Sequence, residues 1–485
     1  MTKKVNPVLR RLQEQNKINM NNFLDVFSEQ SINGETSLFL GAGVSQNSGL
    51  PSWKNILLPC AKELNLSLDN ETDLYAIAQF YANRYGDDLL RRKISSEINR
   101  IVGSNKLLDA VLDIGFKSIW TVNYDSLIED GLTSRGIPNN IIIGDKNLPN
   151  INKYDKVNIY KLNGDISSPN DMIITKDDYE KYDRKHKLFL TFLKKEFVAN
   201  TFLFLGYSFT DNLVLSTLNS INEYLGKTGN RHYALMMVDE KTDTRFEYFC
   251  EDLKKRYGVT CIFVMRDDYI NLVNRIIRQI RDKKIFISGS YHDVDEDTNK
   301  FADQLSYHLV SMLLESGYRL STGIGKRLGT FVTGYAHQYL AEKETAVNPN
   351  KYLSMRPFPF HIDLPNNMKI KYREIMQRDC SATIFLFGQS LSTLKEGGFE
   401  KTGHYSKGVY MEFQIARRKG NVVIPVGSTG FEAEVIWKEV KENINKYPYL
   451  SQYIDKLKDE TDPQELATII VAILNEVSEN RIIQQ

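Results

Sequence analysis

Four short segments of this chain combine glycine with small polar or acidic side chains, and each directly follows or ends a run of apolar residues. They are 41–45 (GAGVS), 121–125 (TVNYD), 161–165 (KLNGD) and 205–211 (LGYSFTD). Glycine lets backbone N–H groups approach a phosphate, and asparagine and aspartate side chains can hydrogen-bond ribose hydroxyls. Because the carboxyl ends of parallel strands meet at one edge of a sheet, we expect these segments to line one nucleotide-binding crevice.

The residues of this predicted crevice divide by the chemistry that they offer. Asn123 and Asn163 are the candidates for contact with the reacting group. The candidates for holding a nucleotide substrate are the small and acidic residues Gly41, Ala42, Gly43, Ser45, Asp125, Ser208 and Asp211. Each segment alone is also typical of an ordinary turn, and only the set of four favours nucleotide binding.

A second group of the same kind lies in the C-terminal part of the chain. Its small residues, which would surround a phosphate, are Ser288, Gly289, Ser290, Gly323, Gly325, Gly427 and Thr429. Arg373 suits a phosphate, and Glu412 suits a ribose diol or an adenine amine, so both are candidates for the same ligand. The alternative is that these two residues are exposed charges on helices.

The elements that must position these residues alternate between apolar strands and helices. This alternation predicts an α/β fold with two Rossmann-like, doubly wound domains, at 1–282 (core about 30–275) and 283–485. The predicted strands are 36–40, 118–122, 158–162, 201–205, 233–238 and 260–264 in the first domain, and 284–288, 319–321, 382–387 and 421–426 in the second.

The remaining segments are predicted from periodicity and breaker residues. We expect helices over 73–85, 185–198, 434–446 and 463–480, and either a helix or a tail outside the first sheet in the first twenty residues. The proline-rich stretch 348–367 is predicted to be irregular, and 397–405 (GGFEKTGHY) is predicted to be a loop.

Composition narrows the class of protein. The 485 residues include 62 Lys and Arg against 61 Asp and Glu, so no basic surplus supports nucleic-acid binding. No apolar run has the length of a membrane span, and the N-terminus lacks a secretory signal. The four cysteines form no C-x-x-C pair, which argues against a structural zinc site or a disulfide framework. We therefore expect a soluble cytoplasmic protein with no metal, membrane or nucleic-acid partner.

The first set of motifs resembles the sirtuin-like family over about 30–275. GAGVS is similar to the GAGxS motif of that family, TVNYD to TxNxD, KLNGD to KxHGD, and GYSFTD to GxSxxD. The resemblance implies a domain that uses NAD as its substrate and needs no prosthetic group. The zinc-binding cysteine pairs of protein-deacylating sirtuins are missing here, which favours the bacterial sirtuin-like domains that consume NAD in antiphage defence.

The sequence departs from this family at its catalytic histidine, where it has Asn163. The implied reaction cleaves the nicotinamide glycosidic bond through an oxocarbenium-like transition state, which requires oriented hydrogen bonds and a positioned water. An imidazole can accept a proton from that water, and a neutral carboxamide cannot. Asn123 would orient the ribose diol or the water, while Asp125 and Asp211 would orient other groups or contact the ribose. We therefore expect this sequence to be impaired in catalysis.

The C-terminal part resembles the SLOG family, whose Rossmann domains bind nucleotide-derived ligands. It lacks the PGGxGT motif of the catalytic members, so the resemblance implies a sensor. A sirtuin-like domain followed by a SLOG domain is similar to the effectors of the Thoeris antiphage system. For these effectors the family implies a homotetramer that is activated by a cyclic ADP-ribose isomer, which a TIR-domain partner produces.

Three functions remain open at this stage. An effector-gated NAD+ glycohydrolase fits both motif sets and the missing zinc cysteines. A non-catalytic sensor that binds NAD or ADP-ribose fits Asn163 better. A zinc-free protein deacylase is the third and is disfavoured by the cysteines.

Overall fold

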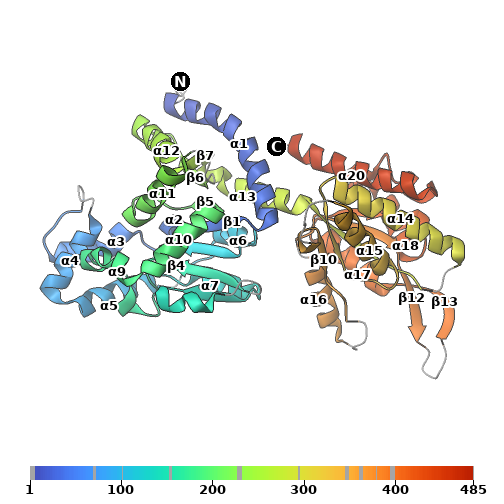
Figure 1. Cartoon of the computed structure of the whole chain (residues 1–485), viewed down its shortest axis with the longest axis horizontal. Helices are drawn as coiled ribbons and strands as arrows, with labels where there is room; N and C mark the ends of the chain where they lie inside the picture. The colour runs from blue at the N-terminus through green and yellow to red at the C-terminus, as the bar shows by residue number, and fades with distance from the viewer. Residues whose placement is uncertain are drawn as a thin grey trace. The chain divides into compact units, whose positions relative to one another are not determined.

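The chain forms two compact units, Met1–Ile277 and Arg278–Gln485 (Figure 1). The computed structural model describes residues 6–68, 73–100, 102–151, 156–226, 232–292, 295–343, 349–359, 364–377, 379–393 and 399–483. The division between the units falls within helix α13 (Tyr269–Asp282), and the boundary expected between 282 and 283 lies directly after the same helix.

The first unit is built on a parallel sheet of seven strands in the order β3-β4-β2-β1-β5-β6-β7. The strands are β1 (Thr36–Leu40), β2 (Ser118–Thr121), β3 (Asn139–Ile142), β4 (Val157–Lys161), β5 (Thr201–Leu205), β6 (His232–Val238) and β7 (Val259–Met265). Every residue of β1, β4 and β5 is buried, as expected for strands covered on both faces. The predicted doubly wound α/β class is therefore confirmed for this unit.

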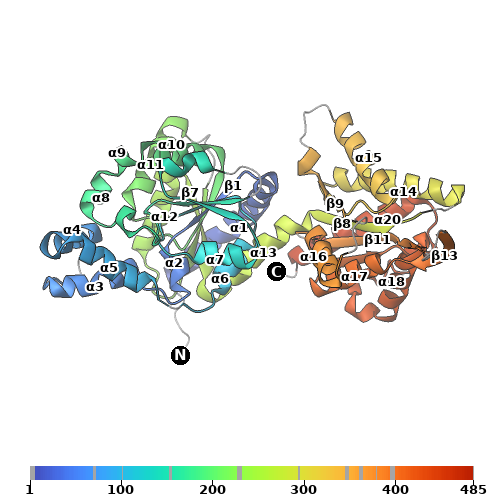
Figure 2. The same ribbon diagram turned by 90° about the horizontal axis from the view of Figure 1, so that it is seen from below.

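Helices cover both faces of this sheet, with α10 and α11 on one side and α6 and α7 on the other (Figure 2). Besides α13, the helices are α1 (Pro7–Asn33), α2 (Ala42–Gln46), α3 (Trp53–Glu63), α4 (Leu74–Tyr85), α5 (Asp87–Ile98), α6 (Lys106–Leu112), α7 (Leu127–Ser134), α8 (Lys176–Glu180), α9 (Tyr182–Lys185), α10 (Lys187–Ala199), α11 (Asn212–Leu225) and α12 (Thr244–Tyr257). The N-terminal segment is thus a helix outside the sheet, the first of the two alternatives considered.

The second unit repeats the plan on a parallel sheet of order β10-β9-β8-β11-β14. Its strands are β8 (Lys284–Ser290), β9 (Arg319–Thr322), β10 (Leu353–Met355), β11 (Ala382–Phe387) and β14 (Val422–Pro425). Its helices are α14 (Glu296–Glu315), α15 (Leu328–Glu342), α16 (Asn366–Met376), α17 (Lys407–Arg418), α18 (Phe431–Glu442), α19 (Lys456–Asp459) and α20 (Pro463–Ile483). No helix among the described residues of either unit is both long and apolar enough to cross a membrane.

Two segments expected to be irregular contain strands. The prediction of a loop at 397–405 is wrong for its described part, because β13 (Phe399–Tyr405) pairs antiparallel with β12 (Gln389–Thr393). Residues 397 and 398 lie outside the described residues. Within 348–367, β10 adds a short edge strand beside β9. In both cases hydrogen bonds between the backbones of neighbouring strands stabilise the strand. The residue types contain little apolar pattern from which the strand could be predicted.

Candidate active site and ligand cleft

The four motif segments of the first unit follow four neighbouring strands, β4, β2, β1 and β5. Leu40 lies between Thr121 and Leu205 in the register, and Thr121 lies beside Lys161. Asn123 lies two residues after Thr121, and Asn163 lies two residues after Lys161. Both asparagines therefore follow the carboxyl ends of the adjacent strands β2 and β4. This edge of the sheet includes the β1–β5 junction, where the strand order reverses and where ligands of such sheets bind.

The glycines of the first segment allow two loops to approach each other closely. The N–H of Gly41 donates to the carbonyl oxygen of Leu205 at 2.9 Å, and the N–H of Gly43 donates to that of Gly206 at 2.9 Å. A Cβ on Gly41 would lie 2.3 Å from the Gly206 oxygen, so no side chain fits there. These two N–H groups are thus already bonded within the protein, which corrects the expectation that they would be offered to a phosphate. Ala42, between them, is exposed.

Asn123, Ser45 and Asp125 form one buried cluster at the end of β2. Ser45 Oγ donates to Asp125 Oδ2 at 2.8 Å, and Asn123 Nδ2 donates to Ser45 Oγ at 2.9 Å and to the carbonyl oxygen of Gly41 at 3.2 Å. Asn123 Oδ1 is buried and has no hydrogen-bond partner in the described structure. Because a buried oxygen without a partner costs free energy, this atom is a natural acceptor for a ligand hydroxyl or water.

Lys161 connects this cluster to the next strand. Its side chain is fully buried, and its Nζ contacts the carbonyl oxygen of Asp125 at 2.7 Å, Glu129 Oε1 at 2.8 Å and the carboxylate of Asp165. Burial raises the pKa of Asp125 and of Glu129 above their ordinary values. Although burial alone would also raise the pKa of Asp165, the Lys161 ammonium holds it below the ordinary value. One cation therefore pairs with two acidic side chains and contacts the backbone of a third acidic residue beside the site.

Asn163 lies at the end of β4 with only 6% of its surface exposed. Its side chain lies beside the hydroxyl of Tyr75 from α4 and acts to lower the pKa of that hydroxyl, which burial raises. The Tyr75 ring lies 5.0 Å from that of Tyr179, whose hydroxyl donates to Asp211 Oδ1 at 2.9 Å. Position 163 thus faces an aromatic pair that sequence reasoning did not single out.

Of the two residues expected from the fourth segment, Asp211 joins this group and Ser208 does not. Asp211 Oδ1 also accepts the N–H of Leu213 at 2.9 Å and so caps α11. Burial raises the pKa of Asp211. Ser208 is exposed, and its hydroxyl is hydrogen-bonded to that of Thr210 at 2.8 Å.

In the second unit, seven of the nine expected residues line one cleft of about 40 Å³ at the carboxyl edge of β8 and β9. They are Ser288, Gly289, Ser290, Gly323, Gly325, Arg373 and Glu412. Gly427 and Thr429 lie outside it. Gly427 packs under Trp437, where a Cβ would be 2.8 Å from the ring, and Thr429 Oγ1 accepts the N–H of Phe387 at 2.7 Å. These two residues shape the turn after β14.

Arg373 and Glu412 form a buried ion pair across the cleft, so neither is an exposed helix charge. Arg373 Nε lies 3.3 Å from Glu412 Oε1, and Ser288 Oγ donates to Glu412 Oε2 at 2.6 Å. The Arg373 guanidinium lies 3.9 Å from the centre of the Phe358 ring. Burial lowers the pKa of Arg373 and raises that of Glu412, since burial disfavours both charges. A ligand phosphate could therefore replace one carboxylate as the partner of this arginine.

The comparisons with known proteins address both units. A family model described as a SIR2-like domain matches residues 117–262, and one described as the Sir2- and TIR-associating SLOG family matches residues 268–477. The NAD(+) hydrolase ThsA of Enterococcus faecium is 31% identical over 492 residues, covering 94% of this chain and 98% of that protein. This chain belongs to the ThsA family.

Other members of the ThsA family show the same coverage of both units. The NAD(+) hydrolase ThsA of Bacillus cereus (strain MSX-D12) is 28% identical over 94% of this chain and 97% of its own length. That of Acinetobacter baumannii (strain 532279) is 29% identical over 88% and 92%. Defense-associated sirtuin 2 of Bacillus subtilis matches only 40% of this chain. The similarity to the ThsA family therefore extends over the first and the second unit together.

Proposed function

We propose that this chain is an NAD+ glycohydrolase of the ThsA family, which cleaves NAD+ to nicotinamide and ADP-ribose in antiphage defence. The observation that carries the proposal is the buried Asn123 Oδ1, which has no hydrogen-bond partner in the described structure, on a side chain whose Nδ2 donates to Ser45 Oγ. Membership of a family whose curated members are named NAD(+) hydrolases supports the same substrate.

The proposed reaction breaks the bond between C1′ of the ribose and the nicotinamide nitrogen. The bonding electron pair leaves with nicotinamide, water adds to C1′, and one proton of that water is released. Asn123 would orient the water or a ribose hydroxyl, and the acidic cluster of Asp125, Glu129 and Asp165 would favour the positive charge that develops on the ribose. The group at position 163 would receive the proton, which a carboxamide cannot do.

In the second unit we propose a regulatory site for a cyclic ADP-ribose isomer, supplied by a TIR-domain partner. The cleft measures about 40 Å³, while pockets for ligands of drug size measure about 300–1,000 Å³. A nucleotide would therefore have to separate α16, which carries Arg373, from α17, which carries Glu412. This separation is the change that we propose couples ligand binding to hydrolysis.

The test of the hydrolase assignment is the variant Asn163→His. Assayed with a cyclic ADP-ribose isomer present, it should release nicotinamide from NAD+ roughly 100- to 10,000-fold faster than the present sequence, the usual contribution of a positioned general base. The double variant Asn163→His with Asn123→Ala should be slow again and is the matched control. Rapid hydrolysis by the unchanged sequence would disprove the base role of position 163.

A second candidate function is favoured by Asn163 itself, whose side chain cannot act as a base. In that case the first unit binds NAD+ or ADP-ribose without cleaving it. Calorimetric binding of NAD+ to the present sequence, combined with no nicotinamide release by Asn163→His, would establish this alternative.

A further inference from the structure

A short stretch of extended backbone, Met172–Thr175, crosses over two of the motif segments, and we refer to it as the strap. Its central residue, Ile173, is bonded to both segments. The N–H of Ile173 donates to the carbonyl oxygen of Asn163 at 2.8 Å, and the hydroxyl of Tyr124, which lies between Asn123 and Asp125, donates to the carbonyl oxygen of Ile173 at 2.6 Å. One residue of the strap thus ties the residue at position 163 to the segment that carries Asn123.

The strap lies very close to the segment that it crosses. Gly164 has a φ of +90°, and a Cβ there would lie 2.9 Å from the Cα of Met172. Met172 is 1% exposed and Ile174 is fully buried, so the strap is packed into the protein on both sides of Ile173. Movement of the strap would therefore move Asn163.

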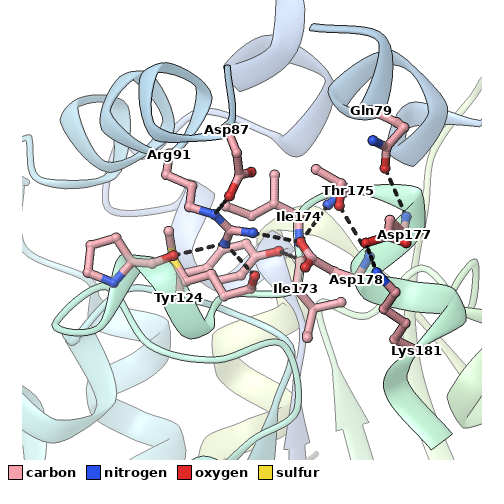
Figure 3. A network of polar contacts seen from close by, with 12 residues as sticks. Gln79, Asp87, Arg91, Tyr124, Ile173, Ile174, Thr175, Asp177, Asp178 and Lys181 are labelled. Atoms are coloured by element: carbon pink, nitrogen blue, oxygen red, sulfur yellow. Dashed lines mark hydrogen bonds and ion pairs between the residues drawn. The ribbon is translucent and has the colours of Figure 1, made fainter. Parts of the chain in front are cut away.

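Arg91 from α5 and Asp178 from α8 hold the strap at its two ends (Figure 3). Arg91 Nη1 donates to the carbonyl oxygens of Met172 at 2.7 Å and of Pro169 at 2.9 Å. Asp178 Oδ2 accepts the N–H groups of Ile174 at 3.2 Å and of Thr175 at 3.1 Å. The two side chains also pair directly, with Arg91 Nη2 2.9 Å from Asp178 Oδ2.

The charges of Arg91 and Asp178 are consistent with a rigid support for the strap. Arg91 is 5% exposed, and its Nε also donates to Asp87 Oδ2 at 2.6 Å, so the guanidinium binds two carboxylates and two carbonyls. Although burial opposes ionisation of Asp178, the N–H of Thr175 and the charge of Arg91 keep its pKa below the ordinary value. Only a planar fork of donors can make these contacts together, and the ammonium of lysine cannot.

We propose that Arg91 and Asp178 are positioning residues of the hydrolytic site, which fix the spacing between Asn123 and position 163 through the strap. The inference rests on the proposed function. It also goes beyond that function, because both side chains lie outside the four motif segments and neither is expected to touch the substrate. A misplacement of about 1 Å at a reacting group can lower a rate by about 100-fold, so small shifts of the strap are sufficient.

The experiment uses the full chain with Asn163→His as the parent. Into it are introduced Arg91→Lys, Asp178→Asn, and both together. The matched controls are Arg92→Lys and Asp177→Asn, at neighbouring positions on the same two helices. The side chain of Arg92 is exposed, and that of Asp177 pairs with the exposed Lys181. Nicotinamide release in the presence of a cyclic ADP-ribose isomer gives kcat and KM for NAD+, and circular dichroism confirms that each variant is fully folded at the assay temperature.

We expect Arg91→Lys to lower kcat by about 10- to 100-fold with less than about a threefold change in KM, and Asp178→Asn to lower it less. The double variant should be no slower than Arg91→Lys alone, because both act through one strap. The controls should match the parent. A lower melting temperature with unchanged kcat would overturn the inference, because it would show a role in stability only. If the parent releases no nicotinamide, the proposed function and this inference both fail, whereas an active parent with equally active variants disproves the inference alone.

Discussion

At the scale of single residues, the charge balance around Lys161 is the feature closest to the proposed chemistry. Its ammonium contacts Glu129 and Asp165 and the backbone of Asp125, while burial raises the pKa of Glu129 and Asp125. Water is excluded here, so the interaction of these acids with a developing positive charge is weakly screened. We therefore expect the cluster to act on the ribose through its charge and not through a carboxylate that attacks as a nucleophile.

His232 at the start of β6 gives a prediction about pH. Burial lowers its pKa to about 3, and its Nδ1 accepts the N–H of Phe202 at 3.2 Å. Because the unfolded chain binds a proton near pH 6.5 and the folded chain does not, the stability from this group is complete above pH 6.5 and is lost as pH falls towards 3. Between pH 7 and pH 5 the loss should be about 2 kcal/mol in the unfolding free energy.

The measurement is urea unfolding of the full chain at pH 7 and at pH 5. His232→Asn, whose amide oxygen can still accept the Phe202 N–H, should remove most of the pH-dependent loss. His337→Asn, at an exposed position on α15, is the control and should keep it. An equal loss in His232→Asn and in the unchanged chain would assign the pH dependence to other groups.

The sequence could predict the residues that follow strands, because residue type at a strand end is a local signal. It could not predict Glu129, Tyr75 or Arg91, which reach the site from helices whose placement depends on tertiary packing. Arg91 stands next to Arg92 in a charged helix, and only the structure shows that one is buried and the other exposed. The sequence also predicts that Gly41 and Gly43 offer their N–H groups to a phosphate. This prediction is wrong, because both N–H groups donate within the protein.

At the scale of elements, the contact between the loops after β1 and β5 holds the candidate site together. Gly206 has a φ of +63°, and a Cβ there would lie 2.6 Å from the backbone nitrogen of Val44. Together with Gly41, it allows two backbone segments to touch without side chains between them. The close contact between these two loops therefore depends on glycine at both positions.

Gly41→Ala tests this contact. Its new methyl group would meet the backbone of Gly206 and Tyr207, so the two loops must separate. We expect the unfolding free energy of the first unit to fall by about 1–3 kcal/mol and NAD+ binding to weaken. Gly103→Ala, whose nearest atom would be the Ser48 oxygen at 3.8 Å, should change neither in denaturant unfolding and calorimetry. Equal stability and affinity in both variants would contradict this view of the loops.

The strands that the sequence missed are all edge elements. β3 and β10 are short outer strands, and β12 and β13 form a hairpin apart from the two main sheets. Central strands such as β1 and β5 end in the apolar run Leu-Phe-Leu, and these were predicted at their observed bounds. An edge strand is stabilised mainly by backbone pairing on one side, so its residue types carry less information.

At the scale of the whole molecule, the proposed gating has a consequence for the oligomeric state of the protein. A shift from mostly inactive to mostly active requires about 5 kcal/mol of differential affinity, which coupled subunits supply more readily than one ligand site. We therefore expect a homotetramer by light scattering. The Asn163→His variant should show sigmoidal activation by a cyclic ADP-ribose isomer, and adding Arg373→Ala should shift the curve to higher ligand concentration. A monomer with hyperbolic activation would rule out this scheme.

The order of the two units along the chain has a consequence during synthesis. The β1–β5 junction can form as soon as residue 205 has left the ribosome, whereas β11 must wait for its partner β14 at residues 422–425. At about 5–20 residues per second, the interval between the two events is on the order of ten seconds or more. Under the proposed gating, each nascent chain thus completes its NAD+-consuming part before the sensor that controls it. A cell that makes this protein would need the ungated intermediate to be inactive, and the homotetramer expected above would meet this need by making hydrolysis depend on assembly between finished chains.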